Sequence, residues 1–579
     1  MKNDHLKELL IRLQNRYSVD SVEMTTGDWL CQNTSLRGRP FSFTRYPFQE
    51  QIANDPHPNM DVIKPSQVGL SEIQIRKALA FVARNRGTTL IFTLPNEKMF
   101  ERMSTTRVLP LVKEEKVFNL ETRSGEKASR SRGLIQIGSS FLYVTGATEG
   151  DATSISADAV FNDEVDLTDQ QMLALFNSRL QNSDYKVNQR FSTPTFNNFG
   201  IDQGYQNSDQ HEYMKKCDCC GHWQIPTFSR QFVDIPGLPD DFEHLHEIDQ
   251  PLLDTGRIDI LNATVVCEKC HAPIDLSHGR EWVPSFASRT HARGYRVRPF
   301  STSRLGPDYI ISQLLKYKER DFLRGWYNTV LGEAYTAGNA RLSDADIAQC
   351  FTSQMTKPDV DRTIPTWVGI DMGQTCHLIL GQGESVEKMD CIEFRAIPVE
   401  ELVGVVQEIL ETYNVIGGAV DRHPYTPTAD ELWRISGGRI LPLEYRGQKD
   451  FNLVRDEVTL EIKHAQANRT ALIDEVARVV RLHRIRFSGY GIQKSTITEH
   501  LKDMVRDESP EKPATWIKLT GNDHYFHALA FLLGGLRLKD YEQGRFSDSR
   551  TTLIVETANM AGLDKGLFGI NRQANRGIY

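Results

Sequence analysis

Residues 60–72 read Met-Asp-Val-Ile-Lys-Pro-Ser-Gln-Val-Gly-Leu-Ser-Glu, and this stretch determines the expected fold of the first half of the chain. A short apolar strand at residues 62–63 runs into a loop that contains Gly69, and a helical pattern begins at Ser71. In a strand–turn–helix unit, backbone N–H groups and the helix N-terminus can surround a phosphate group. We therefore predict a nucleotide phosphate loop, with an ordinary glycine-containing turn as the alternative.

The predicted loop departs from the usual phosphate-binding pattern, which ends in Gly-Lys-Ser/Thr. Leu70 occupies the lysine position, so Lys64 at the start of the loop would have to supply the missing positive charge. Ser71 keeps the hydroxyl group that holds Mg²⁺ in such sites. We assign Gln67 and Gly69 to the same ATP-binding loop.

An acidic pair follows the predicted loop. A largely apolar strand at residues 159–162 ends in Asp163 and Glu164, with strand-like segments at residues 89–93 and 141–144 before it. Phosphoryl transfer depends on positioning and charge neutralisation, so we expect Asp163 to hold Mg²⁺ and Glu164 to polarise the attacking water. An isolated acidic pair after a strand more often lies in a solvated loop. Here the pair follows a predicted phosphate loop, which favours a role in ATP hydrolysis.

Hydroxyl groups near a third strand end are candidates for coupling hydrolysis to movement. They belong to Ser192, Thr193 and Thr195. At a strand end close to the γ-phosphate, such groups could sense hydrolysis and transmit it to bound DNA. Taken by itself, the segment is only a turn.

Two Cys-x-x-Cys pairs predict a metal site. They are Cys217 with Cys220, and Cys267 with Cys270. Four thiolates in this pattern suit tetrahedral zinc, and a closed ligand set indicates a structural role. Cys219 is the expected spare thiol, although it could exchange roles with Cys217. Unliganded cysteines are the alternative.

Acidic residues also end strands in the second half of the chain. Residues 367–370 lead into Asp371, and residues 418–420 lead into Asp421. Carboxylates at neighbouring strand ends can share divalent metals that activate water and stabilise the leaving oxygen in phosphodiester cleavage. Either acid alone would more often be a capping residue. The expected third ligand is Asp523, and His527, one helical turn later on the same face, is a nitrogen ligand or a supporting group.

Composition is that of a globular protein. The chain has 579 residues, too many for one core, and we found no apolar run long enough for a membrane span. The first 20 residues lack the apolar core of a signal peptide, which predicts a cytosolic protein. The net charge of −8 weakens the case for a surface that binds nucleic acid everywhere, but a local basic groove would suffice.

In this order, the motifs resemble those of lambda-type (gpA family) tailed-phage terminase large subunits. The resemblance spans roughly residues 40–540 and rests on residues 64–72, the pair at 163–164 and residues 192–195. A displaced loop lysine is a known variation there, which fits Lys64. The resemblance implies that Tyr46 and Gln49 contact adenine, with an ordinary helix start as the alternative. The family typically has aspartate where this chain has His527, which puts the metal stoichiometry in doubt.

The resemblance implies an α/β fold. It would combine a P-loop (RecA/ASCE-like) ATPase domain, a ribonuclease-H-like nuclease domain and a small zinc-ribbon-like insertion between them. The expected segments are an N-terminal helix (1–35) that contacts a small subunit or caps the ATPase domain, the ATPase domain (36–208), the zinc insertion (209–292), a connector (293–361), the nuclease domain (362–540) and a flexible tail (541–579).

The function implied is that of a viral packaging motor. ATP with Mg²⁺ would drive double-stranded DNA into a procapsid, and a nuclease with Mg²⁺ or Mn²⁺ would cut concatemeric DNA. The implied partners are DNA, a small terminase subunit, the portal protein and further copies in a ring, all in the host cytoplasm. The alternative is a helicase-like DNA-dependent ATPase with a degenerate nuclease domain. A non-enzymatic zinc adaptor would leave both sets of strand-end acids unexplained.

Overall fold

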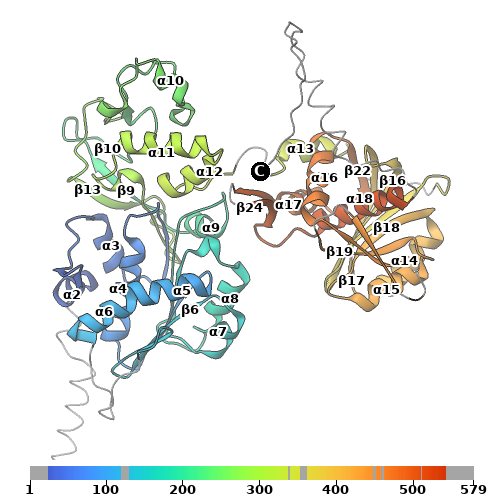
Figure 1. Ribbon diagram of the computed structural model, residues 1–579, viewed down its shortest axis with the longest axis horizontal. Coiled ribbons are helices and arrows are strands. Elements are labelled where there is room, and N and C mark those ends of the chain that lie inside the picture. The colour runs from blue at the N-terminus through green and yellow to red at the C-terminus, as the bar shows by residue number, and fades with distance from the viewer. Residues whose placement is uncertain are drawn as a thin grey trace, which may run out of the picture. The chain divides into compact units, whose positions relative to one another are not determined.

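The computed structural model describes residues 24–118, 130–336, 340–352, 361–447, 451–456, 458, 462–509 and 512–542. The chain forms two compact units, which are coloured by residue number in Figure 1. Unit 1 is Met1–Ala340 with Glu508–Pro513, and unit 2 is Arg341–Asp507 with Ala514–Tyr579. Most of the predicted N-terminal helix and of the predicted tail lies outside the described residues.

Unit 1 is built on a mixed sheet with a parallel centre. Its order is β10-β9-β14-β3-β8-β7-β4-β6-β5, with β13 paired to β9. The parallel strands are β14 (Arg293–Arg296), β3 (Asn59–Ile63), β8 (Val187–Ser192), β7 (Ala159–Asp163), β4 (Thr89–Leu94) and β6 (Ser140–Gly146). β3, β7 and β4 are almost wholly buried, as expected for parallel strands covered on both faces. The carboxyl ends of these strands lie at one edge of the sheet.

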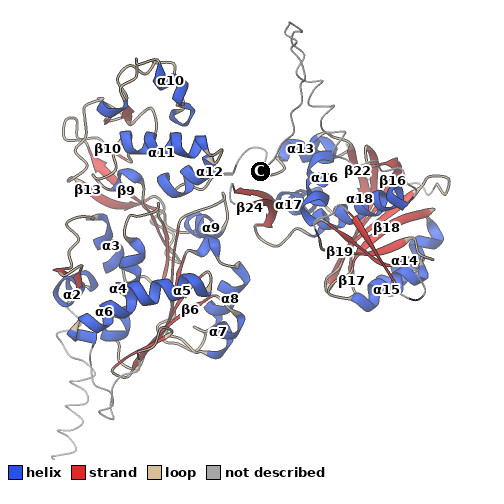
Figure 2. Ribbon diagram, in the orientation of Figure 1, coloured by secondary structure: helices blue, strands red, loops and turns tan. Residues whose placement is uncertain are grey.

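Helices cover this sheet, as Figure 2 shows. The longest described helix of unit 1, α4 (Leu70–Arg84), packs on β4, β6, β7 and β8, and buries Ile73, Ile75, Leu79 and Val82. The other elements before residue 210 are α2 (Thr26–Asn33), β1 (Ser35–Leu36), β2 (Arg39–Pro40), α3 (Phe48–Asn54), α5 (Glu97–Met103), α6 (Leu109–Glu114), β5 (Leu134–Ile137), α7 (Glu149–Ser154), α8 (Gln170–Ser178) and α9 (Gly200–Asn207).

The cysteine-containing segment is an excursion from the edge of this sheet. It leaves after β9 (His211–Lys216) and returns through β13 (Arg280–Pro284), and the Lys216 N–H donates to the Gly279 carbonyl at 2.9 Å. It contains β10 (Trp223–Gln224), β11 (Val233–Asp234), α10 (Gln250–Asp254) and β12 (Thr264–Val265). Val233, Ile235 and Ile248 share one core with α11 (Pro307–Glu319) and α12 (Leu323–Trp326).

Unit 2 has an eight-stranded mixed sheet in the order β20-β21-β19-β18-β15-β16-β17-β22. β15 (Thr366–Asp371), β16 (Thr375–Ser385) and β17 (Lys388–Pro398) are antiparallel, whereas β18 (Val415–Asp421) and β19 (Ile440–Tyr445) run parallel to β15. The remaining strands are β20 (Phe451–Arg455), β21 (Ile462–Ala467) and β22 (Ile485–Tyr490), with β23 (Met504–Ser509) and β24 (Lys512–Lys518) forming a separate pair.

The sheet of unit 2 lies between two apolar cores. Val368 and Ile370 of β15 pack with α14 (Leu402–Thr412) and α15 (Thr426–Ile435). Trp367 belongs to the opposite core, with α16 (Arg469–Arg481) and α18 (His524–Glu542). This alternation follows from the two-residue period of a strand. Two further helices are α13 (Asp344–Cys350) and α17 (Lys494–Lys502).

Helix α18 approaches the sheet closely because glycines face it. A Cβ atom on Gly369 would lie 2.1 Å from the Ala528 carbonyl oxygen, and one on Gly535 would lie 2.4 Å from the carbonyl carbon of Gly418. α18 therefore rests almost directly on the backbones of β15 and β18. Among the described residues, no helix combines the length and apolar character needed to cross a membrane.

We predict that Gly369→Ala lowers the free energy of unfolding of unit 2 by about 1–3 kcal/mol, because the added methyl group overpacks this contact. The matched control is Gly404→Ala in α14, where a Cβ atom meets nothing within 4 Å. Alanine there should leave stability unchanged or raise it slightly. Chemical denaturation followed by circular dichroism measures both, and equal stabilities for the two variants would contradict the close contact.

Candidate active sites

The phosphate-loop residues lie between the end of β3 and the start of α4. Gly69 precedes α4 with φ +77°, and its missing side chain leaves room for Gln49, whose Nε2 would lie 2.8 Å from a Cβ atom there. Gln49 is buried and donates through Nε2 to the Val68 carbonyl at 2.6 Å. No described side chain caps α4, so its first N–H groups remain able to bind an anion.

The Leu70 side chain is buried in an apolar core. It is 1% exposed and packs in a core with Phe48, Met60, Val62 and Phe191. The side chain at this position therefore contributes to folding. Ser71, the next residue, is half-buried in the first turn of α4.

Among the described residues, Lys64 is the only cation paired with Asp163, the last residue of β7, and with Glu164 after it. Its Nζ lies 2.6 Å from Glu164 Oε1 and 3.4 Å from Asp163 Oδ1. Burial disfavours the charged ammonium, but the negative charges of Asp163 and Glu164 more than offset this and hold the pKa of Lys64 above its usual value. Three residues predicted to act on the same phosphate thus meet in one cluster.

Glu164 is held in a left-handed backbone conformation, with φ +56° directly after β7. Such a conformation costs a non-glycine residue on the order of 1–3 kcal/mol and tends to occur at functional sites. The Glu164 N–H donates to the Phe191 carbonyl at 2.8 Å, which ties the acid to β8. Asp163 beside it is 1% exposed.

The predicted coupling residues lie beside this cluster. The Lys64 N–H donates to the Ser192 carbonyl at 3.0 Å, and Ser192 Oγ donates to the Thr193 carbonyl. The N–H and hydroxyl of Thr195 both donate to Asp166 Oδ2, at 2.7 and 2.8 Å. Burial raises the pKa of Asp166 to about 7. Sequence reasoning missed Asp166, which joins the acidic turn to the hydroxyl segment and stands two residues after Glu164.

The four cysteines predicted to bind metal come together. Cys217 and Cys270 have their Sγ atoms 3.7 Å apart, as do Cys220 and Cys267, and all four Sγ atoms lie within 4.8 Å of one another. A tetrahedron with Zn–S bonds of 2.3 Å has S–S edges of about 3.8 Å. Cys219 is exposed and outside the group. The four thiols therefore fit a zinc ion.

The two cysteine pairs sit in equivalent turns. The Cys217 N–H donates to the His222 carbonyl and the Cys267 N–H to the Ala272 carbonyl. The residue after each second cysteine has positive φ, +71° at Gly221 and +55° at His271. His222 does not join the group, because its Nε2 pairs with Glu268 at 2.9 Å.

In unit 2, Asp371 and Asp421 end the adjacent parallel strands β15 and β18. Burial raises the pKa of Asp421 to about 7, and the negative charge of Asp371 adds to the shift. The pKa of Tyr445 is raised well above its usual value by burial and then by the charges of Asp371, Asp421 and Asp523. All three predicted acids therefore contribute negative charge to the surroundings of the Tyr445 hydroxyl group.

Two histidines join Asp371. Asp371 pairs with His377 across the β15–β16 hairpin, and His524 Nδ1 lies 2.9 Å from Asp371 Oδ2. The His377 and His524 rings stack with centroids 4.4 Å apart. One ligand atom from each of the three residues lies within 4.8 Å of the others, and within the described chain the buried Nδ1 of His377 has no hydrogen-bond partner. This group could hold a metal ion.

Asp523 and His527 bind each other. His527 Nε2 lies 3.1 Å from Asp523 Oδ2, and His527 Nδ1 lies 2.9 Å from the Tyr445 hydroxyl. The two residues lie one helical turn apart, and the His527 N–H donates to the Asp523 carbonyl at 3.1 Å. Neither residue belongs to the three-residue group around Asp371. Sequence reasoning missed His377, and it placed His524 in the candidate ligand segment without choosing it as a ligand. The short hairpin after Asp371 was the signal for His377.

One comparison with known proteins matches part of unit 1, and another covers most of the chain. Residues 36–285 match the family model described as phage terminase large subunit gpA, ATPase domain. Among solved structures, the HK97 bacteriophage large terminase aligns with a TM-score of 0.51 and 10% identity over 88% of this chain and 100% of its own. That similarity establishes a shared α/β fold. No curated protein matches the sequence.

Two further solved structures are similar. The large terminase from a thermophilic bacteriophage aligns with a TM-score of 0.29 and 11% identity over 85% of this chain and 98% of its own. The large terminase nuclease of thermophilic phage G20c with bound magnesium aligns with a TM-score of 0.24 and 11% identity, over 33% of this chain and 94% of its own.

Proposed function

Residues 36–285 belong to the gpA family of phage terminase large subunits, of which they form the ATPase domain, and we propose that this chain drives double-stranded DNA into a procapsid and cuts concatemeric DNA. The observation that carries the proposal is the cluster of Lys64, Asp163 and Glu164 beside an uncapped helix N-terminus. The fold shared with the HK97 large terminase supports extending the assignment to unit 2.

The ATPase proposal gives each residue a role. Gly69 and the first N–H groups of α4 bind the phosphates, and Ser71 and Asp163 hold Mg²⁺. Lys64 is shared between the acids and the phosphates, so that its charge replaces the one absent at Leu70. Glu164 polarises the attacking water when Lys64 releases it. Thr195, held by Asp166, couples the state of the phosphates to DNA.

The nuclease proposal assigns a ribonuclease-H-like role to unit 2. Asp371 and Asp421 end adjacent parallel strands, and Asp523 is linked through His527 to Tyr445, the last residue of β19 beside β18. Carboxylates at such positions would hold Mg²⁺ or Mn²⁺, which supplies an activated water and stabilises the leaving oxygen. His524 and His377 add nitrogen ligands beside Asp371. Imidazole suits transition metals better than Mg²⁺, so these histidines favour Mn²⁺ over Mg²⁺.

The zinc proposal assigns a structural ion to Cys217, Cys220, Cys267 and Cys270, in a zinc-ribbon-like module. The supporting observation is the close match between the 3.7 Å Sγ–Sγ distances and a zinc tetrathiolate. The ion would stabilise a segment that has only short strands of its own.

The remaining roles are inferred from the family. We propose a small terminase subunit as partner of residues 1–35, a portal protein as partner of residues 541–579, and further copies of this chain in a ring. The ATPase unit would be RecA-like, and the protein would act in the host cytoplasm.

We predict that Glu164→Gln lowers kcat for ATP hydrolysis by about 10²–10⁴-fold, because the water loses its polarising carboxylate. Lys64→Met should lower kcat similarly, and adding Leu70→Lys should not restore it, because position 70 faces a core. Phosphate-release assays with DNA measure the rates. Lys113→Met, at an exposed lysine, is the control. Recovery of activity in the double variant would show that the charge can act from position 70.

We predict that the wild-type chain linearises or degrades plasmid DNA with Mn²⁺ and less actively with Mg²⁺, and that Asp371→Asn abolishes cutting while leaving ATP hydrolysis intact. Agarose-gel assays measure cutting. Asp361→Asn, at an exposed loop, should cut normally. If the wild-type chain leaves plasmid intact with both metals, unit 2 is a degenerate nuclease and the helicase-like alternative applies.

We predict one zinc ion per purified chain by elemental analysis. Cys267→Ser should lose the ion and lower the melting temperature of unit 1, because a buried thiolate ligand is removed. Cys219→Ser should keep the zinc ion and leave the melting temperature unchanged, because Cys219 lies outside the ligand group. A zinc content that is unchanged in Cys267→Ser would refute the ligand set.

A further inference from the structure

Residues 327–335 follow α12 in unit 1 and lie outside residues 36–285, which match the family model. A π-helical turn, Tyr327–Leu331, continues directly from α12 and ends at Gly332, whose φ is +67°. Such turns are rare and occur frequently at functional sites. The proposed function assigns no role to this segment.

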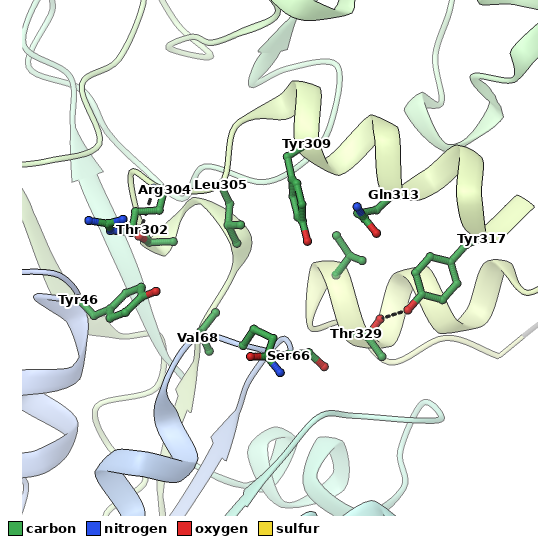
Figure 3. Close-up of a pocket in the computed structure, with 12 residues that line it drawn as sticks. Tyr46, Ser66, Val68, Thr302, Arg304, Leu305, Tyr309, Gln313, Tyr317 and Thr329 are labelled. Carbon is green, nitrogen blue, oxygen red and sulfur yellow. Dashed lines mark hydrogen bonds between the residues drawn. The ribbon is translucent and has the colours of Figure 1, made fainter. Parts of the chain in front are cut away.

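The segment contacts the phosphate loop. The Ser66 N–H donates to the Thr329 carbonyl at 2.8 Å. The Thr329 hydroxyl in turn lies 2.8 Å from the Tyr317 hydroxyl of α11, as the dashed line in Figure 3 shows. A Cβ atom on Gly332 would lie only 2.8 Å from the Pro65 nitrogen, so the two backbones pass in direct contact. The start of the loop therefore rests on this segment.

The same segment binds Thr195, the last of the predicted coupling residues. Asn328 is buried, and its Nδ2 donates to the Thr195 carbonyl at 2.9 Å and to the Glu333 carbonyl at 2.8 Å. The Tyr335 N–H donates to the same Thr195 carbonyl at 3.1 Å. The N–H and hydroxyl of Thr195 are bonded to Asp166. Thr195 is therefore held by Asp166 on one side and by this segment on the other.

Contacts of its own keep the segment in shape. The rings of Tyr327 and Tyr335 stack with their centroids 4.4 Å apart and an angle of 9° between their planes. The Glu333 carboxylate lies 3.2 Å from the Arg298 guanidinium, which also pairs with Glu212 of β9 at 2.7 Å. These ion pairs fix the segment to the sheet. The loop and the Thr195 backbone thus share one ordered support.

This support determines how far apart two parts of the proposed ATPase site lie. The phosphate loop follows β3, whereas Thr195 follows β8. Thr329 binds the loop and Asn328 binds Thr195, and these two residues are consecutive. Their separation is set by the turn, so the distance between the loop and Thr195 is set as well. Such distances matter because a misplacement of about 1 Å can lower a reaction rate about 100-fold.

We infer that residues 327–335 set the distance between the phosphate loop and Thr195, with Asn328 and Gly332 as positioning residues for ATP hydrolysis. Asn328 acts through Thr195. Gly332 acts through Pro65, which can approach because position 332 has no side chain. This role rests on the proposed ATPase function, and it adds to that function a support that neither binds phosphate nor holds Mg²⁺.

The test measures kcat and KM for ATP hydrolysis by the full chain with Mg²⁺ and duplex DNA. Asn328→Asp keeps the shape of the side chain but sets a carboxylate against the Thr195 and Glu333 carbonyls. It should lower kcat about 10–100-fold and leave KM within about twofold of the wild type, because the phosphate-binding groups are intact. Asn328→Gln, which keeps the amide donor, should recover part of kcat. Asn85→Asp is the matched control, because it removes an amide donor at the far end of α4, where Nδ2 donates to the Phe81 carbonyl at 2.8 Å.

Two glycines provide a second matched pair of variants. Gly332 and Gly87 both have positive φ, +67° and +81°, so alanine strains the backbone at each. A Cβ atom at Gly332 meets Pro65, whereas one at Gly87 meets nothing within 4 Å. Gly332→Ala should therefore lower kcat about tenfold or more, and Gly87→Ala should leave it unchanged. Melting temperatures show whether each variant is folded, and the glycine pair decides the test if Asn328→Asp does not fold.

Wild-type kcat in folded Asn328→Asp and Gly332→Ala would overturn the positioning role and leave the ATPase function standing. Asn328→Gln that is as slow as Asn328→Asp, with KM raised in both, would also overturn it, because that pattern indicates general disruption of unit 1. If neither Asn328→Asp nor Gly332→Ala folds, the segment serves folding and the positioning role is wrong. A wild-type chain that neither binds nor hydrolyses ATP would overturn the ATPase function and the positioning role together.

Discussion

Parallel pairing of neighbouring strands is the constraint on which both candidate sites depend. Strands that run in one direction present their carboxyl ends at one edge, so residues far apart in the chain meet there. In unit 1, β3, β7 and β8 bring together Lys64, Glu164 and Ser192. In unit 2, β15, β18 and β19 do the same for Asp371, Asp421 and Tyr445. The side chains at the two edges differ, but in both units the parallel pairing of strands brings them together.

The depth at which each edge is buried sets its electrostatics. Lys64 stays charged in a buried position because two acids face it, and those acids tolerate each other because of Lys64. In unit 2, Asp371 pairs with His524 and Asp523 with His527, whereas Asp421 has its pKa raised. A divalent cation would relieve that excess of negative charge, as Lys64 does in unit 1.

Much of this arrangement follows from local patterns. Apolar runs ending in acids predict buried strands with a functional edge, and two cysteine pairs predict four convergent thiols. The parts that could not be predicted depend on tertiary contacts. The core around Leu70 is assembled from Phe48, Val62 and Phe191, which no local pattern connects. The contact of His524 with Asp371 requires α18 to rest on Gly369, and only the assembled sheet reveals that approach.

The core shared by the cysteine module and α11 has a thermodynamic consequence. Residues such as Val233 and Ile248 pack against Ile310 and Leu314, while the outer side of the same helix faces the loop of residues 66–68. A metal ion that orders the module would therefore also restrict α11 and the side of it that faces the loop. By reciprocity, if the metal ion strengthened the binding of a ligand at this loop, the ligand would strengthen the binding of the metal ion by the same factor. The two sites would then titrate as one linked system.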